Sequence, residues 1–243
     1  MKNILVLVFL IISKNLSAQS KFLEFGIGAK YDFFKITQSN NYFKTNFDFG
    51  ALIHFSFSKK INEKLMWQAG FATNNYKLNF RINSPTGQLF SERELVNILR
   101  SNRIFLNINY NLKKINEKLE LTSSIGASLI FAAKNPNDAA LQRSREFETS
   151  QGTQSINFSI KTYGITGSAI LLNADARLYY LLNSDINFVT TLAITSGVSE
   201  LSKAEVTYAI NSATQYSKAI FETNGFSPFL SLGIQYKLKE NSK

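Results

Sequence analysis

The sequence Lys59-Lys60-Ile61-Asn62-Glu63-Lys64-Leu65 occurs twice in this chain, at 59–65 and again at 113–119. Each copy stands between two runs in which apolar and polar residues alternate. Alternation with a period of two is typical of strands with one apolar and one polar face, so each copy is predicted to be a tight turn between strands. Longer links, near 83–102, 134–154 and 199–220, fall between these turns. Short turns at one end and long loops at the other predict an antiparallel up-and-down transmembrane β-barrel.

The alternating runs predict eight strands, at about 22–36, 42–58, 65–82, 103–112, 119–131, 156–182, 186–195 and 226–238. In the third run the apolar positions change parity after Phe71 and continue at Tyr76 and Leu78. A β-bulge near Asn74-Asn75 would explain the change, because one extra residue moves every later side chain to the other face. The sixth run is long and could be divided near Gly164–Gly167, which makes ten strands the alternative.

The apolar face of such a barrel points either inward around a ligand, as in a soluble lipocalin, or outward to lipid. The polar face is rich in glycine, asparagine and charges of both signs, which suits a narrow packed lumen. Aromatic residues on the apolar face gather near the short turns, as expected of the girdle that meets lipid headgroups. We therefore predict a membrane barrel whose girdle on this side contains Phe55, Phe57, Trp67, Tyr110, Tyr180 and Tyr236.

Charged residues on the polar face are predicted to form ion pairs inside the barrel, because unpaired charges do not persist in a small, poorly hydrated lumen. Asp32 and Lys44 flank the first loop, and Glu24 and Lys237 lie on the two strands that close the barrel. The chain as a whole carries a formal charge of +10, so the positive excess is expected in turns, loops and tail. The predicted lumen network consists of Glu24, Lys30, Asp32, Lys44, Asp48, Glu120, Asp175, Arg177 and Lys237.

The first residues have the order of a secretory signal peptide. Lys2 supplies a positive charge, an apolar run extends from Ile4 to Ile12, and Ala18 provides a small residue for cleavage before Gln19. This run is shorter than the roughly 20 residues of a membrane-spanning helix. We predict that residues 1–18 are removed and that 19–243 form a single barrel domain. The chain contains no cysteine, which excludes disulfides and thiol chemistry.

Few residues suggest catalysis or ligand chemistry. His54 is the only histidine, and Ser56 shares its face, but two residues along a strand is a packing distance rather than a nucleophile–base contact. No spacing of His, Cys or Asp predicts a metal site, and no Gly-rich phosphate loop predicts a cofactor. Basic residues are scattered, so nucleic-acid binding is not supported. We predict no catalytic residue, no cofactor and no metal.

The whole pattern resembles the small eight-stranded outer-membrane barrels: the OmpX type, the membrane domain of OmpA and the PorT-like barrels of Bacteroidetes. The resemblance rests on the Ser17-Ala18-Gln19 junction, the alternating strands over 21–238 and the closing run from Leu230 to Leu238. It implies insertion in the outer membrane of a Gram-negative bacterium. Two features depart from these families: Lys239–Lys243 follow the last strand, and no peptidoglycan-binding module follows the barrel.

Three functional hypotheses follow. The first is a non-enzymatic barrel, embedded in outer-membrane lipid, whose long loops bind a protein partner or stabilise the membrane. The second is a narrow channel for ions or small solutes, and the third is an enzyme that depends on His54. For the first hypothesis, the predicted contact segments are 83–102 and 199–220, through Leu89, Phe90, Val206, Tyr208, Ile210, Tyr216 and Ile220.

Overall fold

The computed structural model describes residues 20–38, 42–45, 49–82, 93–132, 141–149, 152–164, 168–211 and 216–238. The proposed signal peptide and the Leu89-Phe90 contact lie outside these ranges. No helix within them is long and apolar enough to cross a membrane. The strands are β1 (Lys21–Tyr31), β2 (Lys35–Gln38), β3 (Phe43–Thr45), β4 (Phe49–Lys60), β5 (Leu65–Ile82), β6 (Arg93–Lys114), β7 (Leu119–Ala132), β8 (Leu141–Thr149), β9 (Gly152–Gly164), β10 (Ser168–Leu181), β11 (Ile186–Gly197), β12 (Ser202–Ile210), β13 (Ser217–Thr223) and β14 (Ser227–Leu238).

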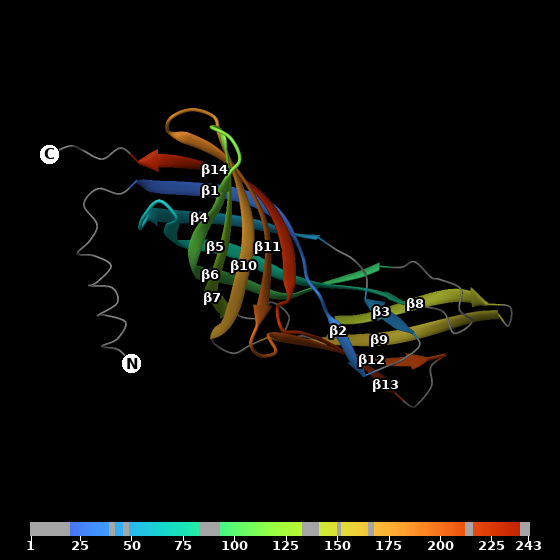
Figure 1. Ribbon diagram of the computed structural model, residues 1–243. Coiled ribbons are helices and arrows are strands. Elements are labelled where there is room, and N and C mark those ends of the chain that lie inside the picture. Colours follow the sequence, from blue (N-terminus) through green and yellow to red (C-terminus); the bar gives the residue numbers. More distant parts are fainter. Residues whose placement is uncertain are drawn as a thin grey trace, which may run out of the picture.

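Eight antiparallel strands close into a barrel, in the order β5-β4-β1-β14-β11-β10-β7-β6, and pairing of β5 with β6 completes the ring (Figure 1). The first and last barrel strands meet along their whole length, from Lys21 opposite Leu238 to Lys30 opposite Phe229. The predicted eight-stranded barrel is therefore confirmed, and ten strands is not the count. Short β3 adds to the free side of β5 beyond the ring.

Three short turns join strands at one end, which we call the short-turn end. In the first turn the backbone N–H of Ile61 donates to the carbonyl of Leu65 at 2.8 Å, and Asn62 Oδ1 accepts from the N–H groups of Lys64 and Leu65, both at 2.8 Å. The turn at 182–185 has another sequence but uses Asn183 in the same way. An asparagine that bonds the backbone two residues ahead replaces a backbone turn contact. The shared asparagine, rather than the lysines of the repeat, therefore sets this geometry.

Alternation around the ring divides the barrel as predicted for a membrane barrel. Apolar side chains face outward and are exposed, among them Phe25, Ile125 and Leu192; Ile125 is 71% exposed. Polar side chains of the same barrel wall are buried in the lumen, such as Gln68, Asn107 and Thr191. An exposed apolar belt of this extent is costly in water and favourable against lipid.

The predicted bulge at Asn74-Asn75 is wrong, because β5 keeps one parity throughout. Gln68 and Ala72 point inward, and so do Tyr76, Leu78 and Phe80 further along the same strand. The register shift between β5 and β6 comes later, at Tyr76/Lys77. The environment of the strand changes along its length. Where β5 extends beyond the lipid, its outer face meets water, and its apolar side chains are therefore on the inner face.

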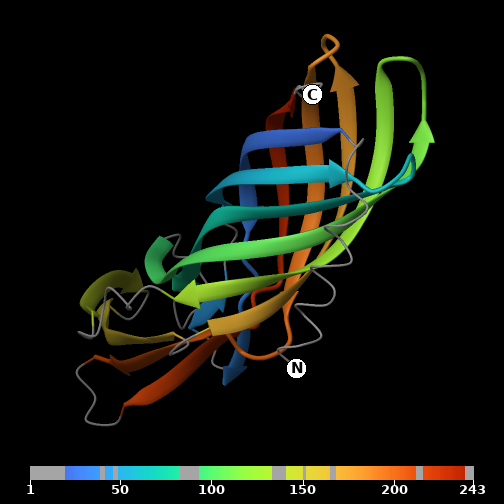
Figure 2. The same cartoon turned by 90° about the vertical axis from the view of Figure 1, so that its left-hand side faces the viewer.

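Beyond one end of the barrel, β2, β13, β12, β9 and β8 form a second, five-stranded antiparallel sheet, which we call the cap sheet (Figures 1 and 2). Its inner face packs on the upper part of β5 and on β3. The residues of this apolar core are buried: Phe43, Tyr76, Leu78, Phe80, Ile82, Ile130, Ile156, Phe158, Ile160, Ala169, Leu171, Leu201, Ala204, Val206, Tyr208, Ala219 and Phe221. The end of the barrel that carries this sheet is called the cap end.

The cap sheet corrects several predicted boundaries. The segments expected to be loops hold strand instead: β6 begins at Arg93, β8 and the start of β9 lie in 134–154, and β12 and the start of β13 lie in 199–220. The predicted strands 22–36, 42–58 and 156–182 each divide between the barrel and a strand above it. Period-two alternation predicts a strand wherever two faces differ, and it does not say which sheet receives the strand.

Candidate functional site

The middle of the lumen contains a connected group of charges. Arg177 on β10 bonds Asp175 through Nε at 2.9 Å and Nη2 at 3.2 Å, and its Nη1 lies 3.4 Å from both carboxylate oxygens of Glu24 on β1. His54 Nε2 on β4 lies 3.1 Å from Glu24 Oε1. All four side chains are buried. The Arg177 guanidinium thus bridges the carboxylates of Asp175 and Glu24. This pairing compensates charges that would be costly to bury without a partner.

A second group lies at the cap end of the lumen. Lys30 Nζ bonds both carboxylate oxygens of Asp32, at 2.7 and 3.0 Å, and stands 3.8 Å from the centre of the Tyr76 ring. Ser227 Oγ donates to Asp32 Oδ1 at 2.6 Å. The carboxylate therefore ties the end of β1 to the start of β14, and the ammonium caps an aromatic ring of the apolar core.

The other residues of the predicted lumen network lie elsewhere. Lys44 is exposed on β3, beyond the barrel, and Lys237 is exposed at the short-turn end, so neither the Asp32–Lys44 pair nor the Glu24–Lys237 pair forms. Glu120 is partly buried at the short-turn mouth, and Asp48 lies outside the described residues. Parity on a strand predicted which face these residues occupy, but Lys44 lies on a strand that the prediction joined to the barrel in error.

The six predicted girdle aromatics all lie on the outer surface near the short turns. Phe55, Tyr110, Tyr180 and Tyr236 are exposed, and the rings of Phe57 and Trp67, half-buried, pack 5.3 Å apart. A second aromatic group was not predicted. At the cap end the Phe33 ring lies 4.4 Å from Tyr31 and 5.2 Å from Phe226. The signal was present in the sequence as Tyr31, Phe33 and Phe226 near the predicted strand ends, with Phe49 in the middle of the predicted strand 42–58.

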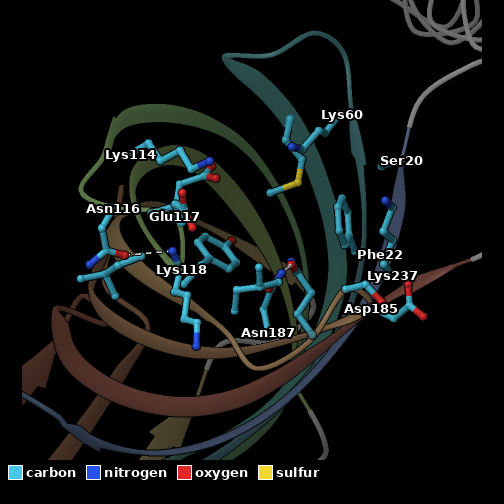
Figure 3. Close-up of a pocket in the computed structure, with 17 residues that line it drawn as sticks. Ser20, Phe22, Lys60, Lys114, Asn116, Glu117, Lys118, Asp185, Asn187 and Lys237 are labelled. Carbon is cyan, nitrogen blue, oxygen red and sulfur yellow. Dashed lines mark hydrogen bonds between the residues drawn. The ribbon is translucent and has the colours of Figure 1, made fainter.

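Two separate cavities lie within the barrel among the described residues. A cavity of about 30 Å³ lies beside His54, Arg103 and Arg177, and has room for about one or two waters. Phe105, Leu52 and Phe229 pack together next to it, and Arg103 lies over the Phe229 ring at 5.4 Å. A larger cavity, of about 250 Å³, lies at the short-turn end (Figure 3). Side chains therefore fill the lumen at mid-height, and the apolar core of the cap covers its cap end.

The surroundings of His54 do not supply a nucleophile. Ser56 Oγ accepts a hydrogen bond from Gln68 Nε2 at 2.8 Å, and the imidazole contacts the carboxylate of Glu24. The ring occupies the space that Gly26 leaves, because a Cβ at position 26 would overlap it. Among the described residues, no group of three or more His, Cys, Asp or Glu side chains could hold a metal ion.

Comparison with solved structures agrees with this architecture. The outer membrane protein OprG from Pseudomonas aeruginosa superposes with a TM-score of 0.51 at 12% identity, over 91% of this chain and 97% of that one. The fold is that of a small outer-membrane β-barrel. Identity this low shows the fold alone.

Two further structures are similar in coverage. A major outer membrane protein from Thermus thermophilus has a TM-score of 0.47 at 13% identity, over 91% of this chain and 100% of that one. Neisserial surface protein A has a TM-score of 0.44 at 10% identity, over 91% of this chain and 100% of that one. No family model matches the chain, and no curated protein sequence matches it.

Proposed function

We propose that this protein is a non-enzymatic barrel of the Gram-negative outer membrane that acts by presenting the outer face of its cap sheet to a partner. The observation that carries the proposal is the closed interior. The mid-lumen cavity of about 30 Å³ is enclosed by ion-paired and apolar side chains, and the apolar core of the cap lies above it. We expect these layers to block the continuous aqueous path that a channel needs.

The outer face of the cap sheet offers polar groups in a regular array. On β12 the outward side chains are Lys203, Glu205 and Thr207, and on β9 they include Asn157 and Ser159. A shallow groove of about 490 Å³ crosses this face, and the Tyr216 side chain at its rim is 70% exposed. Val206 and Tyr208, which the sequence suggested as contacts, are instead buried in the cap core. Ile210 and Ile220 are partly buried, so among the described residues of that set only Tyr216 is exposed.

Single-channel recording tests the closed interior directly. The mature chain, residues 19–243, is refolded, its barrel is verified by a heat-dependent gel shift, and it is inserted in a planar bilayer. We expect no discrete conductance steps. Ohmic steps from the folded protein would establish the narrow-channel alternative and contradict the proposal.

Photo-crosslinking in the native membrane tests the presenting surface. A photoreactive phenylalanine replaces Tyr216 on the cap in one variant and Ile125 on the lipid face in a control. We expect a defined crosslinked product from position 216 and only lipid adducts from position 125. The same pattern of products at both positions would remove the cap sheet as the contact surface.

A further inference from the structure

A cavity at the short-turn end opens into the barrel itself. It holds about 250 Å³ and lies between the turns at 115–118 and 182–185 (Figure 3). Phe22, Met66 and Leu181 supply apolar walls, and Tyr179 and Gln235 also line it. Pockets that hold drug-sized ligands measure roughly 300–1,000 Å³, so this cavity suits a smaller molecule.

The inner wall of the cavity carries a hydrogen-bond donor without a partner. Gln235 is 2% exposed; its Oε1 accepts from Asn187 Nδ2 at 2.9 Å, while its Nε2 has no partner among the described residues. A neighbouring pocket of about 20 Å³ is lined by Asn109 and Thr122, whose buried polar side-chain atoms are also unpartnered in that part of the chain. Buried polar groups are nearly always hydrogen-bonded, so such atoms indicate bound water or a ligand.

Charges of both signs surround the cavity. Four lysines line it, Lys60, Lys114, Lys118 and Lys237, and so do three acidic residues, Glu117, Glu120 and Asp185. None of the seven makes an ion pair with another described side chain. A simple anion would meet the three carboxylates and a simple cation the four ammonium groups. A ligand that carries both charges can satisfy both sets.

We propose that this cavity binds a small zwitterion with an apolar body, of the size of an amino acid or a dipeptide, which enters from the short-turn side. The lysines of the rim hold its carboxylate, the acidic side chains face its ammonium group, and the amide of Gln235 donates to its polar backbone. Phe22, Met66 and Leu181 contact its side chains. The cap sheet plays no part in this site, so the proposal stands apart from the proposed function.

Met66 provides a local probe, because Met1 is the only other methionine of the chain. The refolded protein is labelled with [methyl-13C]methionine and titrated with the dipeptide alanyl-leucine. We expect the Met66 methyl resonance to shift saturably. The N-acetylated and the C-amidated dipeptides each lack one of the two charges, and we expect each to bind about tenfold more weakly, as for loss of one charge-assisted hydrogen bond. Inorganic phosphate lacks both the ammonium group and the apolar body, and we expect it to bind more weakly than the dipeptide.

Two adjacent lysines give a matched pair of variants. Lys114 lines the cavity and Lys113 does not, and both are exposed, so either can be replaced without disturbing the barrel. We expect Lys114→Gln to weaken binding severalfold and Lys113→Gln to leave it unchanged. An unshifted Met66 resonance at saturating dipeptide, an equal effect of both variants, or phosphate binding as strong as dipeptide binding would each overturn the proposal.

Discussion

Arg177 on β10 reaches across the lumen to Glu24 on β1, although 153 residues separate them in the chain, and its Nη1 lies 3.4 Å from both oxygens of that carboxylate. The two strands are not neighbours in the barrel, since β14 and β11 stand between them. The contact therefore crosses the interior of the barrel and is not part of the hydrogen-bonded wall. Asp175 and His54 complete the same group.

Removing the cation of this group should destabilise the barrel. Arg177→Met leaves Glu24 and Asp175 buried without a counter-charge, and breaking a buried ion pair costs roughly 3–5 kcal/mol. Urea unfolding in lipid vesicles, followed by the heat-dependent gel shift, measures the loss. The control Glu24→Gln/Asp175→Asn/Arg177→Met removes both carboxylates as well and should recover most of the stability. A single variant as stable as the wild type would show that the charges are hydrated rather than paired.

A methyl group at position 26 should displace the imidazole of His54. A Cβ there would overlap the ring, so Gly26→Ala forces either the ring or the strand to move. Overpacking of this kind costs roughly 1–3 kcal/mol of unfolding free energy. The double variant Gly26→Ala/His54→Ala removes the clash, so in a double-mutant cycle it should be destabilised by clearly less than the sum of the two single variants. Additive effects in that cycle would contradict the packing described.

The cap should unfold without the barrel when its core is damaged. Phe221 on β13 is fully buried and stacks on Phe80 at 5.4 Å. Phe221→Ala should lower the free energy of unfolding by roughly 3–5 kcal/mol. The cap should be destabilised more than the barrel, because none of the strands of the cap sheet belongs to the ring. Limited proteolysis should then cut within 202–223 while the heat-dependent gel shift stays unchanged. Loss of the gel shift together with the cap would show that the two sheets fold as one unit.

Acid should weaken the outer face of the cap at Glu205. The hydrogen bond from Lys203, 3.0 Å away, lowers the pKa of the Glu205 carboxyl below its ordinary value of 4.5, with further help from the charges of Lys203 and Lys218. A lowered folded-state pKa stabilises the fold above the ordinary value, and that contribution is lost as the pH falls through the folded-state value. Solvent screens a pair this exposed, so the effect on stability should be small.

Hydrogen exchange of β12 measures this effect, after correction for the intrinsic exchange rate at each pH. In the wild type, protection should decrease as the pH is lowered below about 4.5. The decrease should be smaller in Glu205→Gln, which has no titrating carboxyl at this position. Replacing Asp185, which lies at the opposite end, serves as the control. Equal pH dependence in the wild type and Glu205→Gln would assign the acid sensitivity to another group.

Much of the barrel could be predicted from the sequence because lipid imposes a simple rule on it. Each membrane strand has lipid on one face and a narrow lumen on the other, so apolar and polar residues must alternate. The two copies of the repeat marked turns, and the parity of Glu24, Asp175 and Arg177 placed them inside. The third turn at Asn183 shares only its asparagine with the repeat, and it was still recognisable as a short polar link between two runs.

The cap sheet and the partners in the lumen required the tertiary structure. Tyr76, Leu78 and Phe80 alternate just as a lipid-facing strand does, but they face inward because water has replaced lipid outside. Alternation reports that two faces differ, and only the three-dimensional arrangement shows which face is covered. For the charged residues, strand parity in the sequence was enough to predict that they lie on the inner face. Which of them meet, Arg177 with Glu24 rather than Lys237 with Glu24, depends on side-chain reach across the closed barrel, which no local pattern encodes.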